Sequence, residues 1–79
     1  MTQLAVNLDL AAQSVLNRRG DYIVEAENVL TDVSKFLVAN PGIRDYDEVT
    51  DLVADAKDEL DSDPLGVTWY LEELARILR

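Results

Sequence analysis

Apolar residues recur every three or four positions along most of the chain, which is the spacing of one face of an α-helix. The pattern is clearest between Asp21, a residue type that caps helix N-termini, and Asn40-Pro41-Gly42, which stops a helix. The stripe consists of Ile23, Ala26, Leu30, Val33 and Leu37, flanked by Tyr22, Val29 and Phe36, with Glu25, Asn28, Asp32 and Lys35 on the other side. The spacing predicts an amphipathic helix that buries a wide apolar face in a core.

The first segment, roughly residues 4–19, carries two competing patterns. One helical stripe contains Leu4, Leu8, Ala11, Ala12, Val15 and Leu16, whereas Leu4, Val6, Leu8 and Leu10 alternate as in a strand. Arg18 and Arg19 suit a helix C-terminus, and Gly20 suits the position just beyond it. We expect a helix from about Asn7 onward, with a short strand as the alternative for the first six residues.

Two further helices are predicted on either side of Asp61-Ser62-Asp63-Pro64. The earlier one opens with Asp45 and Glu48, which have the spacing of a capping box. Asp63 is the expected N-cap of the last helix, and Pro64 fits its first position. The two apolar stripes are Val49, Leu52, Val53, Ala56 and Leu60, and then Val67, Tyr70, Leu71, Leu74, Ile77 and Leu78.

Short connections between these segments favour antiparallel packing of neighbouring helices. Seventy-nine residues are enough for one domain at most. The sequence therefore predicts an all-α fold, a small bundle of three or four helices in which residues 1–79 form a single acidic domain.

Negative charge is concentrated in one stretch. Residues 45–63 hold nine acids and one base, a net charge of −8, while the whole chain carries −9. Direct binding to nucleic acid is not expected, because the phosphate contacts that dominate such binding need Lys and Arg. A basic protein surface is the natural complement of this stretch. The alternative is a solvated acidic face that only aids solubility.

Four aspartates of the third predicted helix lie opposite its apolar stripe: Asp47, Asp51, Asp55 and Asp58, with Glu48 beside them. If residues 45–63 were all helical, their acids would follow one another about every 3 Å along the axis, close to the phosphate spacing of one DNA strand. Such a helix could occupy a groove that evolved for nucleic acid. The expected partner is then a basic protein surface, for example that of a nucleic-acid-binding enzyme.

Trp69, the only tryptophan, projects about 160° from Val67 on a helical wheel. Its neighbours on that side are Leu65, Glu72, Glu73 and Arg76. One interpretation is that it packs under the first helix or under the loop at residues 40–44, since large apolar groups are usually buried. The other is an exposed binding anchor together with Leu65. The candidate partner-binding residues are therefore Asp47, Glu48, Asp51, Asp55, Asp58, Leu65 and Trp69.

Enzymatic and metal-dependent functions are not expected. The chain has no His and no Cys, so Ser14, Ser34 and Ser62 lack the usual general base, and thiolate or imidazole metal sites are excluded. Four residues match positions of a calcium-binding EF-hand loop: Asp61, Asp63, Gly66 and Glu72. Leu65, however, offers no ligand oxygen, and Pro64 favours starting a helix, so no calcium, other metal or cofactor is expected.

Two families share features with the chain. Its length and acidity resemble acyl carrier proteins, but their attachment motif is Asp-Ser-Leu with two helices after it. Here Asp61-Ser62 is followed by Asp63 and 17 residues remain after Ser62, so the carrier function is excluded. Residues 62–67 are similar to the segment that opens the last helix of nuclease-colicin immunity proteins, which are acidic four-helix inhibitors. The tyrosine pair before that helix has no counterpart here, so no site residue is carried over.

No apolar run approaches the ~20 residues that cross a bilayer, and the start lacks the features of a secretory leader. We expect a cytoplasmic protein that does not bind membranes. The leading hypothesis is an acidic protein-binding module, an inhibitor or antagonist that docks on a basic surface of its partner. The alternative is a self-associating structural or assembly domain, for which a homodimer through apolar helix faces is possible.

Overall fold

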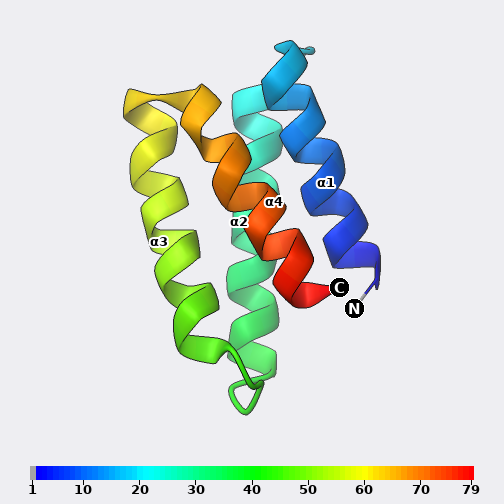
Figure 1. The fold of residues 1–79 in the computed structure, drawn as a ribbon, viewed down its shortest axis with the longest axis vertical. Helices are drawn as coiled ribbons and strands as arrows, with labels where there is room; N and C mark the ends of the chain where they lie inside the picture. The colour runs from blue at the N-terminus through cyan, green and yellow to red at the C-terminus, as the bar shows by residue number, and fades with distance from the viewer. Residues whose placement is uncertain (1) are drawn as a thin grey trace.

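The computed structural model describes residues 2–79, and within them it contains four α-helices and no strand. The helices are α1 (Thr2–Asn17), α2 (Tyr22–Ala39), α3 (Tyr46–Ser62) and α4 (Val67–Leu78), and a 3₁₀ turn, η1 (Pro64–Gly66), leads into α4. Each helix runs antiparallel to the one before it (Figure 1). Both α1 and α3 pack against α2 and against α4, so the four helices form a ring. The predicted all-α bundle is confirmed, with four helices.

The helix α1 begins earlier than expected. It starts at Thr2, so the strand alternative for the first residues is wrong wherever the chain is described; Met1 lies outside the described residues. Leu4 and Leu8 are buried, whereas Val6 and Leu10, which alternate with them, are exposed. A strand would bury Leu4 and Leu8 as well, but its backbone would need a paired strand that the bundle does not provide. A helix satisfies the backbone internally and also buries Ala5, Ala11 and Ala12.

The end of α1 also differs from the expectation. Arg18, not Gly20, takes the left-handed position that follows the helix, with φ of 50°. The Arg18 amide donates to the Val15 carbonyl at 3.2 Å, and the Arg19 amide donates to the Ser14 carbonyl at 2.9 Å. These two bonds are the pair that defines a Schellman motif. Gly20 adopts positive φ as well, at 53°, so it serves the turn into α2 and not the cap of α1.

Three aspartates occupy the predicted N-cap positions but do not cap with their side chains. Asp21, Asp45 and Asp63 precede α2, α3 and η1, and none makes a side-chain cap hydrogen bond. The ψ angles of Asp21 and Asp45 are 58° and 30°, outside the extended region that aims a capping carboxylate at the helix. The capping box expected from Asp45 and Glu48 is therefore not formed. Pro64 does occupy the first position of η1.

The core consists largely of the predicted stripes. Leu8, Leu30, Leu71 and Leu74 are its largest fully buried side chains, and small residues such as Ala11 allow neighbouring helices to approach closely. Several predicted core residues lie only partly inside and pack against the buried set: Tyr22, Phe36, Leu52, Tyr70 and Ile77. Leu16 and Ile23 are exposed, which corrects their assignment to the core. Both lie at an end of their helix, where fewer neighbours surround a side chain.

No helix within residues 2–79 has the length and apolar character needed to cross a bilayer.

The strained cap of α1 generates a stability prediction. An L-residue in the left-handed region costs roughly 1–2 kcal/mol that glycine does not incur. We expect Arg18→Gly to raise the free energy of unfolding by about 1 kcal/mol, which for a domain of this size raises Tm by roughly 4–8 °C. Thermal unfolding followed by circular dichroism measures the change. Arg19→Gly is the matched control, because it removes the same charge at a position without positive φ. Equal Tm changes in the two variants would show that charge, and not backbone strain, is responsible.

Candidate functional site

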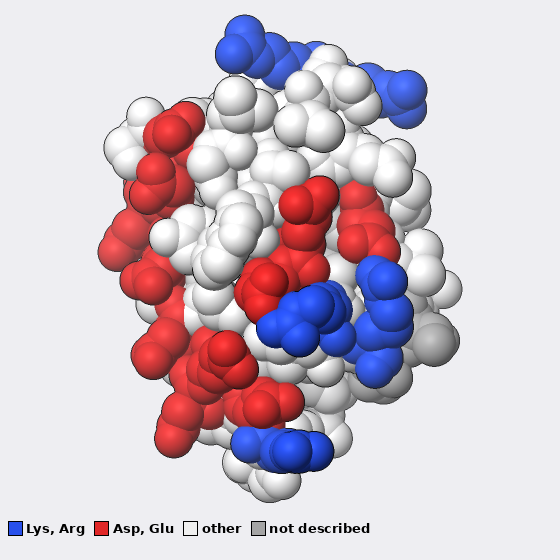
Figure 2. Space-filling model, viewed as in Figure 1, with Lys and Arg blue, Asp and Glu red and all other residues white. Residues whose placement is uncertain are grey.

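The acidic residues singled out in the sequence form one continuous face of α3. Burial of Val49, Val53, Ala56 and Leu60 fixes the rotation of the helix. Asp47, Glu48, Asp51, Asp55 and Asp58 are consequently all exposed. Acidic side chains run as a column along the edge of the molecule that α3 occupies (Figure 2). The structure therefore brings these five predicted residues together on a single surface.

The carboxylates of this face form no ion pair within the described residues, although the charge of Arg76 acts on Glu48 in the first turn of the helix. Within residues 2–79, the ion pairs join Arg76 to Glu73 and Arg79 to Asp9, and neither involves α3. Lys57 is the one base of the acidic stretch. Its ammonium donates a hydrogen bond to Ser34 Oγ of α2, at 3.4 Å, so it points toward the neighbouring helix. The α3 face thus presents its negative field to solvent.

Two observations set the register of α4 against α3. The pKa of Arg76 is raised, first by the hydrogen bond and charge of Glu73, and further by the carboxylates of Glu48 and Asp45. At the other end, a Cβ added to Gly66 would lie 3.3 Å from Glu59 Oε1. Arg76 is therefore level with the first turn of α3, and Gly66 is level with its last turns. Trp69, about one turn beyond Gly66, is therefore level with the middle turns of α3.

Trp69 is 58% exposed, so the interpretation that it packs under α1 or under the 40–44 loop is wrong. Its ring meets the ring of Tyr70 edge-on, with centroids 5.1 Å apart and planes at 84°. Tyr70 is itself half-buried against the core. Leu65, one turn earlier, is 48% exposed. Both candidate apolar residues are thus accessible, and Trp69 is held by a helix and an aromatic neighbour rather than by a loop.

A charged pair borders this aromatic residue. Glu73 accepts hydrogen bonds from both Nε and Nη2 of Arg76, one turn apart on α4. The hydrogen bond to Arg76 lowers the pKa of Glu73, against a smaller opposing effect of burial. Glu73 therefore stays ionised at neutral pH. Trp69 therefore has a charged pair one turn away on α4, whereas Leu65 shares a hollow with Val15, Arg18 and Tyr22, where α1 ends and α2 begins.

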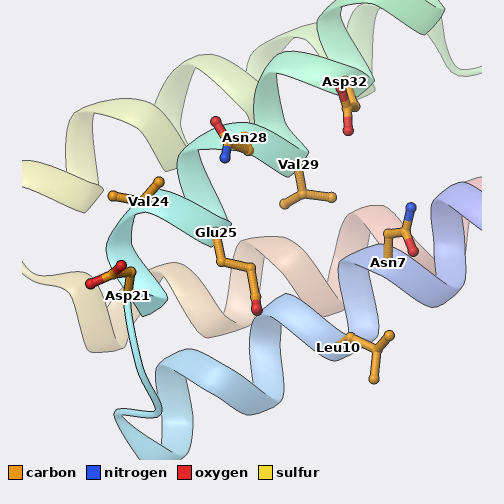
Figure 3. Close-up of a pocket in the computed structure, with 8 residues that line it drawn as sticks. All are labelled: Asn7, Leu10, Asp21, Val24, Glu25, Asn28, Val29 and Asp32. Atoms are coloured by element: carbon orange, nitrogen blue, oxygen red, sulfur yellow. The ribbon is translucent and has the colours of Figure 1, made fainter.

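A concave surface that the sequence analysis missed lies elsewhere on the molecule. It is a groove between α1 and α2 with a volume of about 460 Å³ (Figure 3). Its lining residues are Asn7, Leu10, Asp21, Val24, Glu25, Asn28, Val29 and Asp32. The available signal was weak: Leu10 and Val24 are apolar residues that lie off the core stripes of their helices. A single-helix pattern could not show that they line one groove between two helices.

The acids that resemble an EF-hand loop are distributed over three elements. Asp61 lies in the last turn of α3, Asp63 precedes η1, and Glu72 lies in the second turn of α4. Within the described residues, no group of three or more acidic side chains is arranged to hold a metal ion.

Comparison with known proteins gives no family for this chain. No protein-family model, curated protein or solved structure matches it. Its function is therefore argued from the chemistry of its own surfaces.

Proposed function

We propose that this protein is an acidic binding module that docks the α3 face and the adjoining edge of α4 on a basic surface of a partner protein. The observation that carries the proposal is the column of exposed carboxylates on α3, which form no ion pair within residues 2–79, on a helix that packs against α4 and its exposed Trp69. In this proposal the partner is a nucleic-acid-binding protein, and the module acts as its inhibitor or antagonist.

The two parts of the surface have different physical roles in binding. Unneutralised carboxylates steer a basic partner over a distance set by the Debye length, which is about 8–10 Å in physiological salt. Such steering raises the association rate more than it raises the affinity. Affinity and residence time come from desolvated anchors, among which Trp is over-represented. The proximity of Trp69 to the acidic face supplies both contributions on one surface.

Antagonism follows from competition for the same cations. A basic groove that holds phosphates presents Lys and Arg at intervals matched to a nucleic-acid strand. The carboxylates of α3 form a rod of comparable charge spacing, displayed on a rigid helix. A partner occupied by this helix could not hold a phosphate backbone at the same residues. Inhibition would then require no catalytic group, and the proposed module needs none.

The alternative, a self-associating domain, is favoured by one observation. Val38 of α2 is 80% exposed and Leu10 of α1 is 54% exposed, so apolar surface remains away from α3. Association through such residues would be insensitive to salt, whereas docking through α3 would weaken as salt is raised. Sedimentation of the isolated protein at low and high salt separates the two hypotheses.

The charge hypothesis predicts the effect of changing Asp47, Asp51, Asp55 and Asp58 together to Lys. Capture of partners from a lysate by the immobilised protein, with elution by double-stranded DNA, should recover nucleic-acid-binding proteins with the natural sequence and none with this variant. The fold should persist, because the four side chains are exposed and no cavity is created. Circular dichroism checks the helical content.

A second Lys variant of equal net charge is the control for the first. It changes seven exposed residues outside both α3 and the groove between α1 and α2 to Lys: Gln3, Gln13, Asn17, Glu27, Thr31, Ala39 and Asn40. We expect it to capture the same proteins as the natural sequence. Loss of capture in both variants would mean that net charge matters and the α3 face does not.

The anchor hypothesis predicts that Trp69→Ala separates binding from stability. Removing a hot-spot aromatic costs about 2 kcal/mol or more in binding, which is about 30-fold in Kd. The folded chain should lose only about 1 kcal/mol, because the ring is largely solvated and its main contact is one edge-on pair with Tyr70. Binding titrations and thermal unfolding are measured on the same variant. Val38→Ala, an exposed apolar truncation on α2, is the control. A large fall in Tm with unchanged Kd would contradict the anchor role.

A further inference from the structure

The groove between α1 and α2 combines an apolar floor with acidic walls. Val29 is buried at its base, while Leu10 and Val24 remain about half exposed on either side. Asp21 directly precedes α2, Glu25 lies in its first turn, and Asp32 lies about two turns further along the groove (Figure 3). Its volume of about 460 Å³ falls within the range of pockets that take a ligand.

The charge of the groove is of one sign. No Lys or Arg is among the residues that line it, and none of its three carboxylates forms an ion pair within the described part of the chain. Glu25 accepts a hydrogen bond from Ser14 Oγ of α1, at 3.2 Å, which draws one carboxylate across the space between the helices. Asn7 and Asn28 add amide groups to the rim. A molecule that binds in the groove must therefore have one apolar side to meet the floor. It must also carry cationic groups around that side to meet the carboxylates.

The length of the acidic wall constrains the shape of the occupant. Asp21 and Asp32 are eleven positions apart, which is about 16 Å along a helix. A compact cation would contact one carboxylate and leave the others free. A cationic helix of about three turns would reach all three while one of its large apolar side chains fills the groove.

A second copy of this chain does not fit the groove. In a symmetric dimer the same surface meets itself, so the acids of the two copies would face one another. Like charges brought together at an interface cost free energy. The occupant must come from a chain with an excess of Lys and Arg.

We propose that the α1–α2 groove is a second docking site, which binds a cationic amphipathic helix of a partner protein. In the ring of helices this groove lies on the opposite side from the α3–α4 edge, because α1 and α2 form one flank and α3 and α4 the other. The site is thus separate from the proposed α3 surface, and the two can be occupied at once. The inference does not depend on the function proposed for α3.

The test uses a labelled 15-residue peptide with Leu on one helical face and Lys on the others. Its affinity for the natural protein is measured by fluorescence anisotropy. We expect at least tenfold weaker binding by the double variant Leu10→Gln with Val24→Gln, and by the double variant Asp21→Asn with Asp32→Asn. Val38→Gln, a change of an exposed apolar residue outside the groove, is the control and should keep full affinity. A peptide of the same composition, with Leu scattered around the helix, should also bind at least tenfold more weakly.

A second measurement on the natural protein locates the peptide without relying on the variants. Amide chemical shifts should change at residues 7–10 and 21–32, while the fluorescence of Trp69 stays constant because that ring lies on the other flank. Undiminished binding by the groove variants would overturn the proposal. So would shift changes centred on α3, loss of binding in the α3 Lys variant, or displacement of the peptide by micromolar spermine. Failure of the α3 surface leaves the expected results for this groove unchanged, so the two proposals fail separately.

Discussion

The burial of one apolar stripe on α3 is the interaction on which the acidic surface depends. Val49, Val53 and Leu60 are buried, and each contributes roughly 1.5–3 kcal/mol relative to exposure. Against this, like charges one turn apart on a helix cost about 0.2–0.5 kcal/mol per pair. Even several such pairs amount to less than the burial of the stripe. Burial of the apolar stripe can therefore stabilise a helix whose outer face carries carboxylates that repel one another.

The same constraint determines what that face can do. A helix that is fixed by its buried side cannot rotate to bring its carboxylates near the cations of the domain. Lys57 illustrates the point, because it lies on the flank of α3 that faces α2 and bonds to Ser34. Within residues 2–79 the acidic face forms no ion pair, and the charge of Arg76 acts only at its first turn, on Glu48 and Asp45. An external cation is then the available source of neutralisation, and a protein with Lys and Arg at matched spacing supplies it without ordering free ions.

The sequence predicts most of the helices because, in each segment, the apolar periodicity ends where residues that terminate a helix occur. It predicts the exposure of the acidic face equally well, since all five acidic candidates belong to one helix and one period fixes their direction. The exposure of Trp69 agrees with its position on a helical wheel, away from the apolar stripe of its helix. The local errors have a different origin. Arg18 takes a left-handed position although Gly20 is two residues away, because the hydrogen bonds of the α1 cap are set by where the helix stops packing. The three aspartates make no capping hydrogen bonds because of their backbone angles, which cannot be read from the residue type.

The α1–α2 groove could not be predicted, because it depends on the register between two helices. Leu10 and Val24 each look like stray apolar residues when one helix is considered alone. Their common place in one groove is visible only when antiparallel packing sets them beside Val29 and the acids of α2.

Charge alone would make a poor antagonist, and this limits how the α3 surface can work. A negative field attracts every basic protein in its surroundings, and salt weakens all of these encounters alike. Discrimination needs a contact that one partner satisfies and others do not. Trp69 provides such a contact because its ring is held on a helix, beside Tyr70, and level with the middle of the acidic column. A partner must therefore offer a hollow for an indole at a fixed offset from its row of cations. Under the proposed function few basic surfaces would meet both conditions, so the geometry of α4 relative to α3, and not the net charge, would determine which partner is retained.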